Sequence, residues 1–366
     1  MFSSTRITKS LFALIALASV GGCATAGSPL GIGSGGNDAT PSASAPSTQI
    51  APLTGLVFPA DSKFLAGPVV MGKIDNSPEA RPQQGLNSTD IVIDEMVEGG
   101  LTRFLAIWHS NQPTEFGPLR SVRPMDPDLA TAFGGIIAYS GGQRPFVAAM
   151  KATGLYNADE TSEAGKGTME RVSNRVAPHN LFVKAQALQA AHPELSPPKP
   201  FLSFVSDSND ASVVSAPTAG QPVSEVKAQF PAATATWDWK KTRWVRTQDG
   251  KALTDAADGK QISAVNVVVL RVAVDRSYRD PKYGYVPKTL LEGTGKGTVF
   301  SGGKALDVTW TKTSQTSYVQ LTDRDGSNVQ LLPGNTWFEL VPSDVGKVTV
   351  TPAVVPAPSG TPKPKS

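Results

Sequence analysis

Acidic residues with possible catalytic roles lie between residues 75 and 98. Glu98 ends an apolar run and precedes Gly99 and Gly100, and Asp75 lies in the same stretch. A carboxyl group in an apolar pocket has a raised pKa and can act as a general acid, and glycosidic bond cleavage needs two carboxyl groups about 5–10 Å apart. Glu98 and Asp75 are therefore candidate catalytic residues. The more frequent role of acids in such a pattern is structural pairing with arginines, and this alternative stays open.

Basic residues form the second set of candidates. Arg103, Arg120 and Arg123 follow one another closely, and Arg81 lies upstream. Guanidinium groups bind carboxylates and phosphates through paired hydrogen bonds. We therefore expect these arginines to bind an anion, such as a stem-peptide carboxylate of peptidoglycan or an anionic wall polymer. Salt bridges to neighbouring acids explain the same residues equally well.

His179 and Asn180 are the remaining candidates for ligand binding. His179 follows Pro178 and opens a segment, His179–Ala191, whose apolar spacing predicts a helix. His179 can orient a substrate or act as a base, whereas Asn180 can equally cap the helix. The three histidines show neither an H-E-x-x-H motif nor any other paired spacing. The sequence therefore predicts no metal site and no cofactor.

The first residues indicate export and lipidation. Arg6 and Lys9 precede the apolar run Leu11–Val20, which is too short to span a bilayer and is typical of a signal peptide. The run leads into Val20-Gly21-Gly22-Cys23, which resembles a bacterial lipobox. Cys23 is the only cysteine, so no internal disulfide is possible. We predict cleavage after residue 22 and a lipid anchor on Cys23 at the extracellular face of the cell membrane. An ordinary secretory signal is the alternative.

Composition limits the possible partners of the mature chain. The 366 residues include 34 basic and 31 acidic residues, and loss of the first 22 removes two basic ones. The resulting charge of about +1 excludes a polybasic nucleic-acid binder as the default. Residues 23–52, rich in Gly, Ser, Ala, Thr and Pro, are expected to form a disordered tether. A Pro-rich tail, residues 346–366, is also expected to be disordered.

Two folded regions are expected between the tether and the tail. Residues 53–198 mix strand-like and helix-like segments, which predicts an α/β domain. Residues 199–345 contain many strand-like runs separated by turn pairs, which predicts a mostly-β domain. The predicted fold class is α+β. The strands that matter most for the candidate site are Val69–Ile74, Ile91–Val97 and Arg103–Trp108, with a hairpin turn at Gly99-Gly100.

Long motifs in both regions carry a family resemblance. They are Ile74–Gln83, Asp90-Ile91-Val92, Val97–Ile107, Gly117–Pro124, Gly141-Gly142, Pro178–Leu181, Asn266–Val269, Gly293–Gly295, Trp310–Lys312 and Leu332–Trp337. With these motifs the chain resembles the YerB-type lipoproteins of Gram-positive bacteria, a family of unknown function. The resemblance spans roughly Leu53 to Val341 and implies a membrane-anchored extracellular protein of two domains. It implies no activity.

Two functions remain open at this stage. The first is a non-catalytic envelope lipoprotein that is held to the membrane through Cys23 and binds a cell-wall polymer or an envelope protein. The second is an enzyme that cleaves peptidoglycan or another glycan, with Glu98 as general acid. Neither hypothesis involves nucleic acid. We favour the first, and the surroundings of Glu98 distinguish the two. A second carboxylate in an open cleft favours the enzyme, and a close arginine pair favours binding.

Overall fold

The computed structural model describes residues 47–205, 213–282 and 284–354. These residues all belong to one compact unit. The predicted signal peptide, the lipidation site Cys23 and most of the predicted tether lie outside the described residues, as do residues 355–366 of the predicted tail.

Five strands of the first region form one mixed layer. β4 (Ile91–Met96) and β5 (Thr102–Trp108) are antiparallel neighbours, and β5 is also antiparallel to β3 (Val70–Asp75). β6 (Ile136–Ala138) and β7 (Tyr156–Ala158) extend the layer in parallel. Every residue of β3, β4 and β5 is buried, and burial on both faces explains why apolar residues dominate these strands. The strands also carry buried charged residues, among them Lys73, Asp94 and Glu95.

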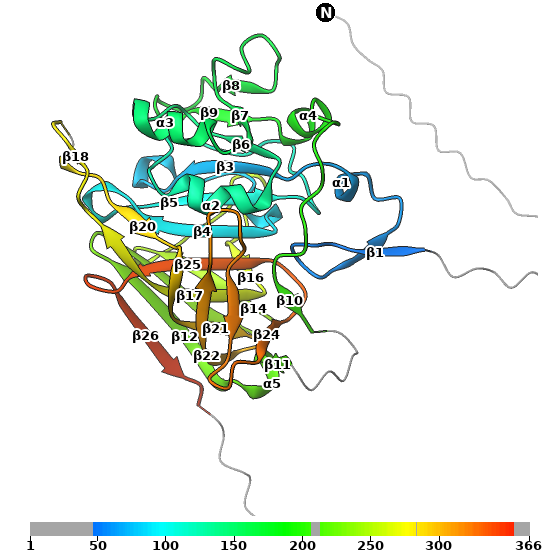
Figure 1. The fold of residues 1–366 in the computed structure, drawn as a ribbon, viewed down its shortest axis with the longest axis vertical. Coiled ribbons are helices and arrows are strands. Elements are labelled where there is room, and N and C mark those ends of the chain that lie inside the picture. The colour runs from blue at the N-terminus through cyan, green and yellow to red at the C-terminus, as the bar shows by residue number, and fades with distance from the viewer. Residues whose placement is uncertain (1–46, 206–212, 283, 355–366) are drawn as a thin grey trace, which may run out of the picture. The chain divides into compact units, whose positions relative to one another are not determined.

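This layer continues into the second region. β25 (Thr336–Pro342) pairs in parallel with β4, and β17 (Asn266–Asp275) pairs in parallel with β25 (Figure 1). β21 (Gly293–Ser301) and β22 (Lys304–Lys312) follow as antiparallel neighbours. The proposed boundary near residue 198 therefore does not divide the sheet. The division of the chain into two separate domains remains a proposal.

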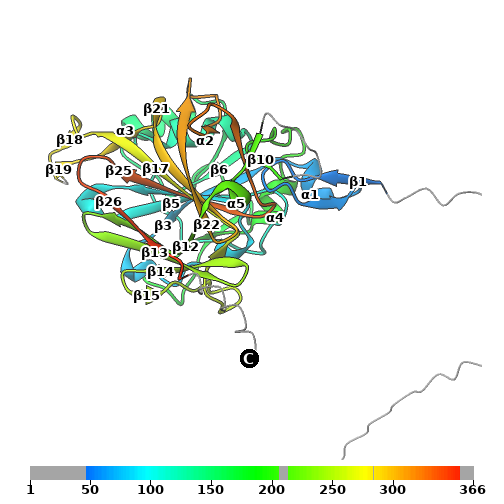
Figure 2. The ribbon, with the colours of Figure 1, turned by 90° about the horizontal axis from the view of Figure 1, so that it is seen from below.

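A second layer packs on one face of this sheet. Its strands run in the order β26 (Lys347–Pro352), β12 (Gln221–Phe230), β13 (Ala233–Lys240) and β14 (Arg243–Gln248), all antiparallel (Figure 2). Trp237 of β13 meets Trp337 of β25 edge-on, with ring centroids 5.2 Å apart. The Trp-rich stretch around residue 237 is thus a core hairpin.

Short helices cover the opposite face over the first region. α2 (Asp126–Ala130) and α3 (Arg144–Lys151) pack there with Leu129, Phe146 and Met150 against the strands (Figure 1). α3 is the longest helix of the described residues, at eight residues. Strands therefore dominate the fold, and the first region is less helical than the predicted α/β mixture.

The remaining elements connect these layers. The further helices are α1 (Lys63–Ala66), α4 (Ala185–Ala190) and α5 (Ala216–Ala219), with 3-10 turns at Pro78–Ala80, Leu86–Ser88, Glu98–Gly100 and Thr131–Phe133. The further strands are β1 (Thr48–Ile50), β2 (Val57–Pro59), β8 (Met169–Arg171), β9 (Leu181–Val183), β10 (Ser203–Phe204), β11 (Val213–Ser215), β15 (Lys251–Ala252), β16 (Ser263–Ala264), β18 (Arg279–Asp280), β19 (Gly284–Tyr285), β20 (Lys288–Leu290), β23 (Gln320–Thr322) and β24 (Asn328–Leu331).

One predicted helix is corrected by the structure. The segment His179–Ala191 begins as strand β9, and only Ala185–Ala190 is helical. β9 pairs with β8, and on its other side Leu181 and Val183 exchange backbone hydrogen bonds with the segment around Phe116. All three residues of β9 are buried. Tertiary hydrogen bonding on both edges thus outweighs the helical spacing of the apolar residues.

The folded part also extends further along the chain at both ends than predicted. Residues 48–50, expected in the tether, form β1 and pair with β2. Lys347–Pro352, expected in the disordered tail, form β26 and pair with β12. Val348 and Val350 alternate with polar residues there, and β-branched residues at alternating positions favour a strand.

Candidate functional site

One cavity of about 640 Å³ brings together most of the predicted site residues. It lies where β3 ends and β5 begins. Six of the eight catalytic and ligand-binding candidates line it, namely Asp75, Glu98, Arg103, Arg120, Arg123 and His179. They come from four separate stretches of the chain, so the tertiary fold assembles the site.

The strand register places the first pair. Asp75 is the last residue of β3, and its partner across the antiparallel ladder is Arg103, near the start of β5. Residues that lie opposite each other on paired strands point to the same face of the sheet. This face carries the helices α2 and α3, and the cavity opens at its end.

The segment after Gly117 brings the second arginine. It runs along the edge of β3, because Asp75 donates its backbone N–H to Pro118 (3.0 Å) and Arg120 donates its own to Lys73 (2.8 Å). This register sets the Arg120 side chain beside the Asp75 carboxylate, with Nε 3.2 Å from Oδ2. No hydrogen bond of the two terminal nitrogens of Arg120 occurs within the described residues. Those donors are available to a ligand.

His179 and Asp75 form the closest contact in the cavity between groups far apart in sequence. The imidazole Nδ1 lies 2.8 Å from Asp75 Oδ2. Asp75 is nearly buried, and its other oxygen accepts the backbone N–H of Ser77 at 3.0 Å. The ionised carboxylate can only accept a hydrogen bond, so Nδ1–H donates to it, and in this tautomer the neutral ring carries its lone pair on Nε2. Within the described residues Nε2 makes no hydrogen bond.

Glu98 is held by an arginine. Arg123 Nε lies 2.8 Å from the Glu98 carboxylate. Burial by itself would raise the pKa of Glu98, but the hydrogen bond and charge of Arg123, with the charge of Arg103, together lower it. The sequence-based expectation of a raised pKa is therefore wrong. Glu98 is ionised at neutral pH and does not have the protonation state of a general acid.

Arg103 and Arg123 are fixed by one carbonyl. Arg103 Nη1 donates to the Ser121 carbonyl at 2.8 Å, and Arg123 Nη1 approaches the same oxygen at 3.4 Å. Burial, followed by the charge of Arg123, lowers the pKa of Arg103 to about 9. The guanidinium thus stays charged at neutral pH but is poorly solvated. A buried cation of this kind is favourable for binding an anion.

A buried ion cluster lies behind the cavity on the same sheet face. Lys73 contacts Asp126 at 2.7 Å and also Glu95, and all three side chains are fully buried. Asp126 accepts the backbone N–H of Arg123. Burial lowers the pKa of Lys73 to about 8. The cluster therefore ties β3 and β4 to the segment that carries Arg123.

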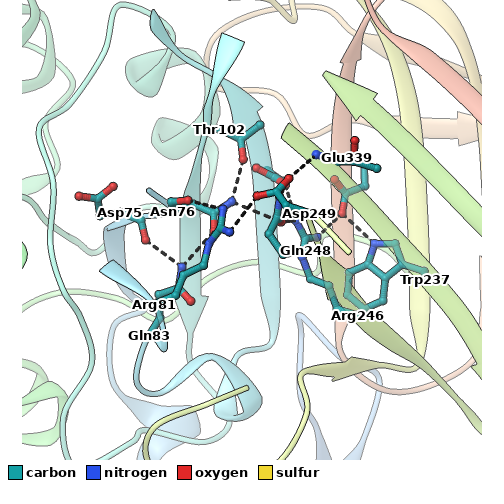
Figure 3. A network of polar contacts seen from close by, with 12 residues as sticks. Asp75, Asn76, Arg81, Gln83, Thr102, Trp237, Arg246, Gln248, Asp249 and Glu339 are labelled. Carbon is teal, nitrogen blue, oxygen red and sulfur yellow. Dashed lines mark hydrogen bonds and ion pairs between the residues drawn. The ribbon is translucent and has the colours of Figure 1, made fainter. Parts of the chain in front are cut away.

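Two predicted site residues lie outside the cavity. Arg81 donates to Asn76 and pairs with Asp249 at 2.8 Å, in a polar network that joins the first region to β14 (Figure 3). Asn180 accepts a hydrogen bond from Arg171 at 2.8 Å. It caps no helix, because α4 starts after Lys184.

Other residues of the cavity were not identified from the sequence as candidates. Ser77, Thr102 and Gln143 line it together with the exposed Glu79. Ser77 and Glu79 lie in the Ile74–Gln83 motif, so that motif was the available signal for them, whereas nothing in the sequence singles out Gln143. Among the described residues, no three His, Cys, Asp or Glu side chains gather closely enough to hold a metal ion.

Comparison with protein families identifies both regions. Residues 53–197 match the description "Protein of unknown function (DUF3048) N-terminal domain". Residues 225–338 match the C-terminal domain of the same description. The six cavity residues that were predicted all lie within the first match.

A relative in Bacillus subtilis (strain 168), described as "Putative lipoprotein YerB", is 28% identical over 303 residues, which cover 80% of this chain and 86% of the relative. The crystal structure of the YerB protein from Bacillus subtilis matches with a TM-score of 0.68 at 24% identity. That match covers 82% of this chain and 99% of the other. The family resemblance seen in the sequence is confirmed, and the solved structure shows the same fold.

Proposed function

Since the chain belongs to the DUF3048 family of unknown function and is similar to YerB, we propose that it is a lipid-anchored lipoprotein that binds an anionic group of a cell-wall component. The anion, a carboxylate or a phosphate, occupies the cavity lined by Arg103, Arg120 and Arg123. The proposal has two parts, the anchor and the binding site, and each has separate support.

The anchor is supported by the first residues and by the relative. Val20-Gly21-Gly22-Cys23 resembles a lipobox, and Cys23 is the only cysteine of the chain. The Bacillus subtilis relative carries a lipoprotein name. No helix within the described residues has the length and apolar character needed to cross a membrane. A lipid on Cys23 would hold the folded part at the extracellular face, with residues 24–47 between them.

The binding site is supported by one observation above all, the convergence of three arginines on a single cavity. Three carboxylates line the same cavity, namely Asp75, Glu98 and the exposed Glu79, and Asp75 and Glu98 are already paired with arginines. Arg120 keeps two terminal nitrogens free of hydrogen bonds within the described residues and has a side chain that is 29% exposed. A planar guanidinium with both terminal groups available is the geometry that binds carboxylate or phosphate through two parallel hydrogen bonds.

Cosedimentation with purified cell walls tests this function. The full-length protein in detergent should sediment with the walls, and Arg120→Ala should weaken its retention about 10- to 100-fold, as expected for a charged hydrogen-bonded contact. Arg276→Ala is the matched control, because Arg276 is also a partly exposed arginine paired with a carboxylate (Asp344, 2.7 Å) but lies outside the cavity.

The outcome also identifies the anion. Walls stripped of phosphate polymers by hydrofluoric acid retain peptidoglycan carboxylates. Loss of binding to stripped walls identifies phosphate, and unchanged binding identifies carboxylate. If wild type and Arg120→Ala are retained equally, the cavity is not the binding site. If neither is retained on any wall, an envelope protein becomes the better candidate partner.

A glycan-cleaving enzyme with Glu98 as general acid is the second candidate. Glu98 and Asp75 do line one open cavity. However, Glu98 is ionised by its pairing with Arg123, and Asp75 is engaged by His179 and Arg120. Neither carboxyl group is positioned to donate a proton to a leaving sugar. Soluble muropeptides released from the walls in the same incubation would favour this candidate over the first.

A further inference from the structure

The Asp75–His179 pair has the arrangement of a general base and the residue that positions it. Asp75 Oδ2 lies 2.8 Å from Nδ1 of the ring, and the backbone N–H of Ser77 holds the other carboxylate oxygen. His179 lines the open cavity with a side chain that is 17% exposed. A histidine fixed in this way presents Nε2 as a proton acceptor.

The pair faces the proposed anion site directly. Arg120 Nε approaches the same oxygen of Asp75 that holds the imidazole, at 3.2 Å. An anion bound to the terminal nitrogens of Arg120 therefore lies next to His179. Arg103 and Arg123 line the same cavity. A general base beside several guanidinium groups is a combination suited to phosphoryl transfer, in which negative charge on the phosphoryl oxygens must be stabilised.

We infer that this cavity hydrolyses a phosphodiester, with His179 as general base and Arg120, Arg103 and Arg123 binding the phosphoryl oxygens. The inference rests on the proposed function, because it requires an anion in the cavity, and it names a phosphodiester as that anion. Asp75 is a positioning residue, because it acts through the imidazole.

Water is the nucleophile in this arrangement. Ser77 Oγ lies 3.5 Å from His179, but on the Nδ1 side, which Asp75 already occupies. Ser121 also lines the cavity, and its hydroxyl donates to the Ser140 carbonyl at 3.0 Å. Neither serine is activated by Nε2. A water molecule at Nε2 can reach a phosphorus atom held by the arginines.

The reaction balances without another reactant. His179 Nε2 takes one proton from water while the water oxygen forms a bond to phosphorus. The bond from phosphorus to one ester oxygen then breaks with both electrons remaining on that oxygen. The leaving oxygen departs opposite the attacking water, so it takes its proton from solvent in the open cavity while the imidazolium releases its own proton to solvent. The products are one alcohol and one phosphomonoester, and the arginines neutralise charge on the non-bridging oxygens throughout.

Turnover of defined phosphodiesters tests the inference. The probes are bis(4-nitrophenyl) phosphate and a synthetic poly(glycerol phosphate), incubated with the full-length protein in detergent and in the presence of EDTA. We expect one nitrophenol and one nitrophenyl phosphate per diester, and shorter glycerol phosphate chains from the polymer. His179→Ala should lower the rate about 10²- to 10⁴-fold, and added imidazole should restore part of it because the cavity is open.

Two further variants separate a catalytic role from a structural one. Asp75→Asn should lower the rate and change its pH profile, because the imidazole loses the carboxylate that orients it. His192→Gln is the matched control, since His192 also contacts a carboxylate (Glu194, 3.0 Å) but lies outside the cavity. It should keep the wild-type rate. The charged groups that share the cavity with His179 are Asp75, Glu79, Glu98, Arg103, Arg120 and Arg123.

The results separate this inference from the proposed function. If walls retain the protein through Arg120 but neither probe is hydrolysed, the cavity binds without catalysis and the inference is overturned. Turnover that survives His179→Ala also overturns it. Turnover that depends on His179 supports it, even if wall retention is absent. If the wild type neither hydrolyses the probes nor sediments with the walls, both proposals are overturned together.

Discussion

Replacing Arg246 should destabilise the protein more than a replacement at any exposed arginine. Arg246 is fully buried and lies 2.6 Å from Asp94, and it also donates to Glu339 (Figure 3). Its guanidinium carbon lies 4.8 Å from the ring centroid of Trp337. Asp94 belongs to β4 and Glu339 to β25, and they are register partners where the two regions join.

The magnitude follows from the charges left behind. Burial raises the pKa of Glu339 to about 8 and also raises that of Asp94, while the charge of Arg246 opposes both shifts. Arg246→Met removes the only cation that contacts these two carboxyl groups within the described residues. Removal of one partner from a buried ion pair costs about 3–5 kcal/mol, so we expect a loss of this size at pH 7.

The loss should depend on pH. Burial already keeps a proton on Glu339 at pH 7, so acid adds one proton to the stranded Asp94 carboxylate, and each pH unit offsets at most about 1.4 kcal/mol of the loss. The loss at pH 5 should therefore be smaller than at pH 7 by up to about 3 kcal/mol. Replacement of the whole cluster by apolar side chains, as Arg246→Met with Asp94→Leu and Glu339→Met, should recover most of the stability, because no buried charge remains.

Urea unfolding followed by tryptophan fluorescence at pH 5 and pH 7 measures these differences, and Trp237 and Trp337 lie beside Arg246 as reporters. Arg243→Met is the control, since Arg243 lies on the same strand but hydrogen-bonds only neutral partners, Ser263 and Asn335. Its cost should be about 1 kcal/mol at both pH values. A loss below about 1 kcal/mol for Arg246→Met, or an equal loss at both pH values, would refute the reasoning.

Three further predictions concern the site, the anchor and the pH dependence of stability. Glu98→Gln should leave wall retention equal or stronger, because it removes a negative charge from the cavity; loss of turnover with unchanged wall retention would instead return Glu98 to a catalytic role. Cys23→Ser should abolish incorporation of an alkyne-labelled fatty acid in cells, and labelling that persists would exclude Cys23 as the anchor. Burial raises the pKa of Asp90 to about 6, against about 3.9 in an unfolded chain, so the native state keeps a proton that the unfolded chain loses. The stabilisation from Asp90 is complete below about pH 4 and is lost as the pH rises through about 6. Asp90→Asn should remove this part of the pH dependence of the free energy of unfolding. Urea unfolding at pH 4, 5 and 7 measures it, and a variant that keeps the wild-type slope would contradict the prediction.

Much of the strand layout was predictable because local patterns agree with the tertiary environment. Ile91–Val97 and Arg103–Trp108 are mostly apolar or β-branched, and they form β4 and β5 on either side of the expected turn at Gly99-Gly100. Gly99 and Gly100 both adopt positive φ there, +70° and +75°, a conformation that other residues rarely adopt. Local sequence patterns thus predict the structure correctly where a strand is buried on both faces or where glycines form a sharp turn.

The same reasoning failed where long-range hydrogen bonds decide the conformation. Leu181–Val183 has the spacing of a helix but is held as a strand on both edges. Lys347–Pro352 lies next to a Pro-rich tail, yet β12 supplies a partner for its backbone. The local sequence does not reveal these partners, because hydrogen bonds across the sheet join segments that are distant in the chain.

The sequence by itself determined the family, the lipobox-like motif that ends in Cys23, and the residue types of the candidate site. Only the tertiary structure decided which of those residues lie together and which partners they contact. It joined Asp75 to His179, which lies 104 residues further on, and it removed Arg81 and Asn180 from the cavity. It also paired Glu98 with Arg123, which changed the expected direction of the Glu98 pKa shift. The physical reason is that a side chain's charge state and partners depend on burial and on neighbours within a few ångströms, and the fold sets both.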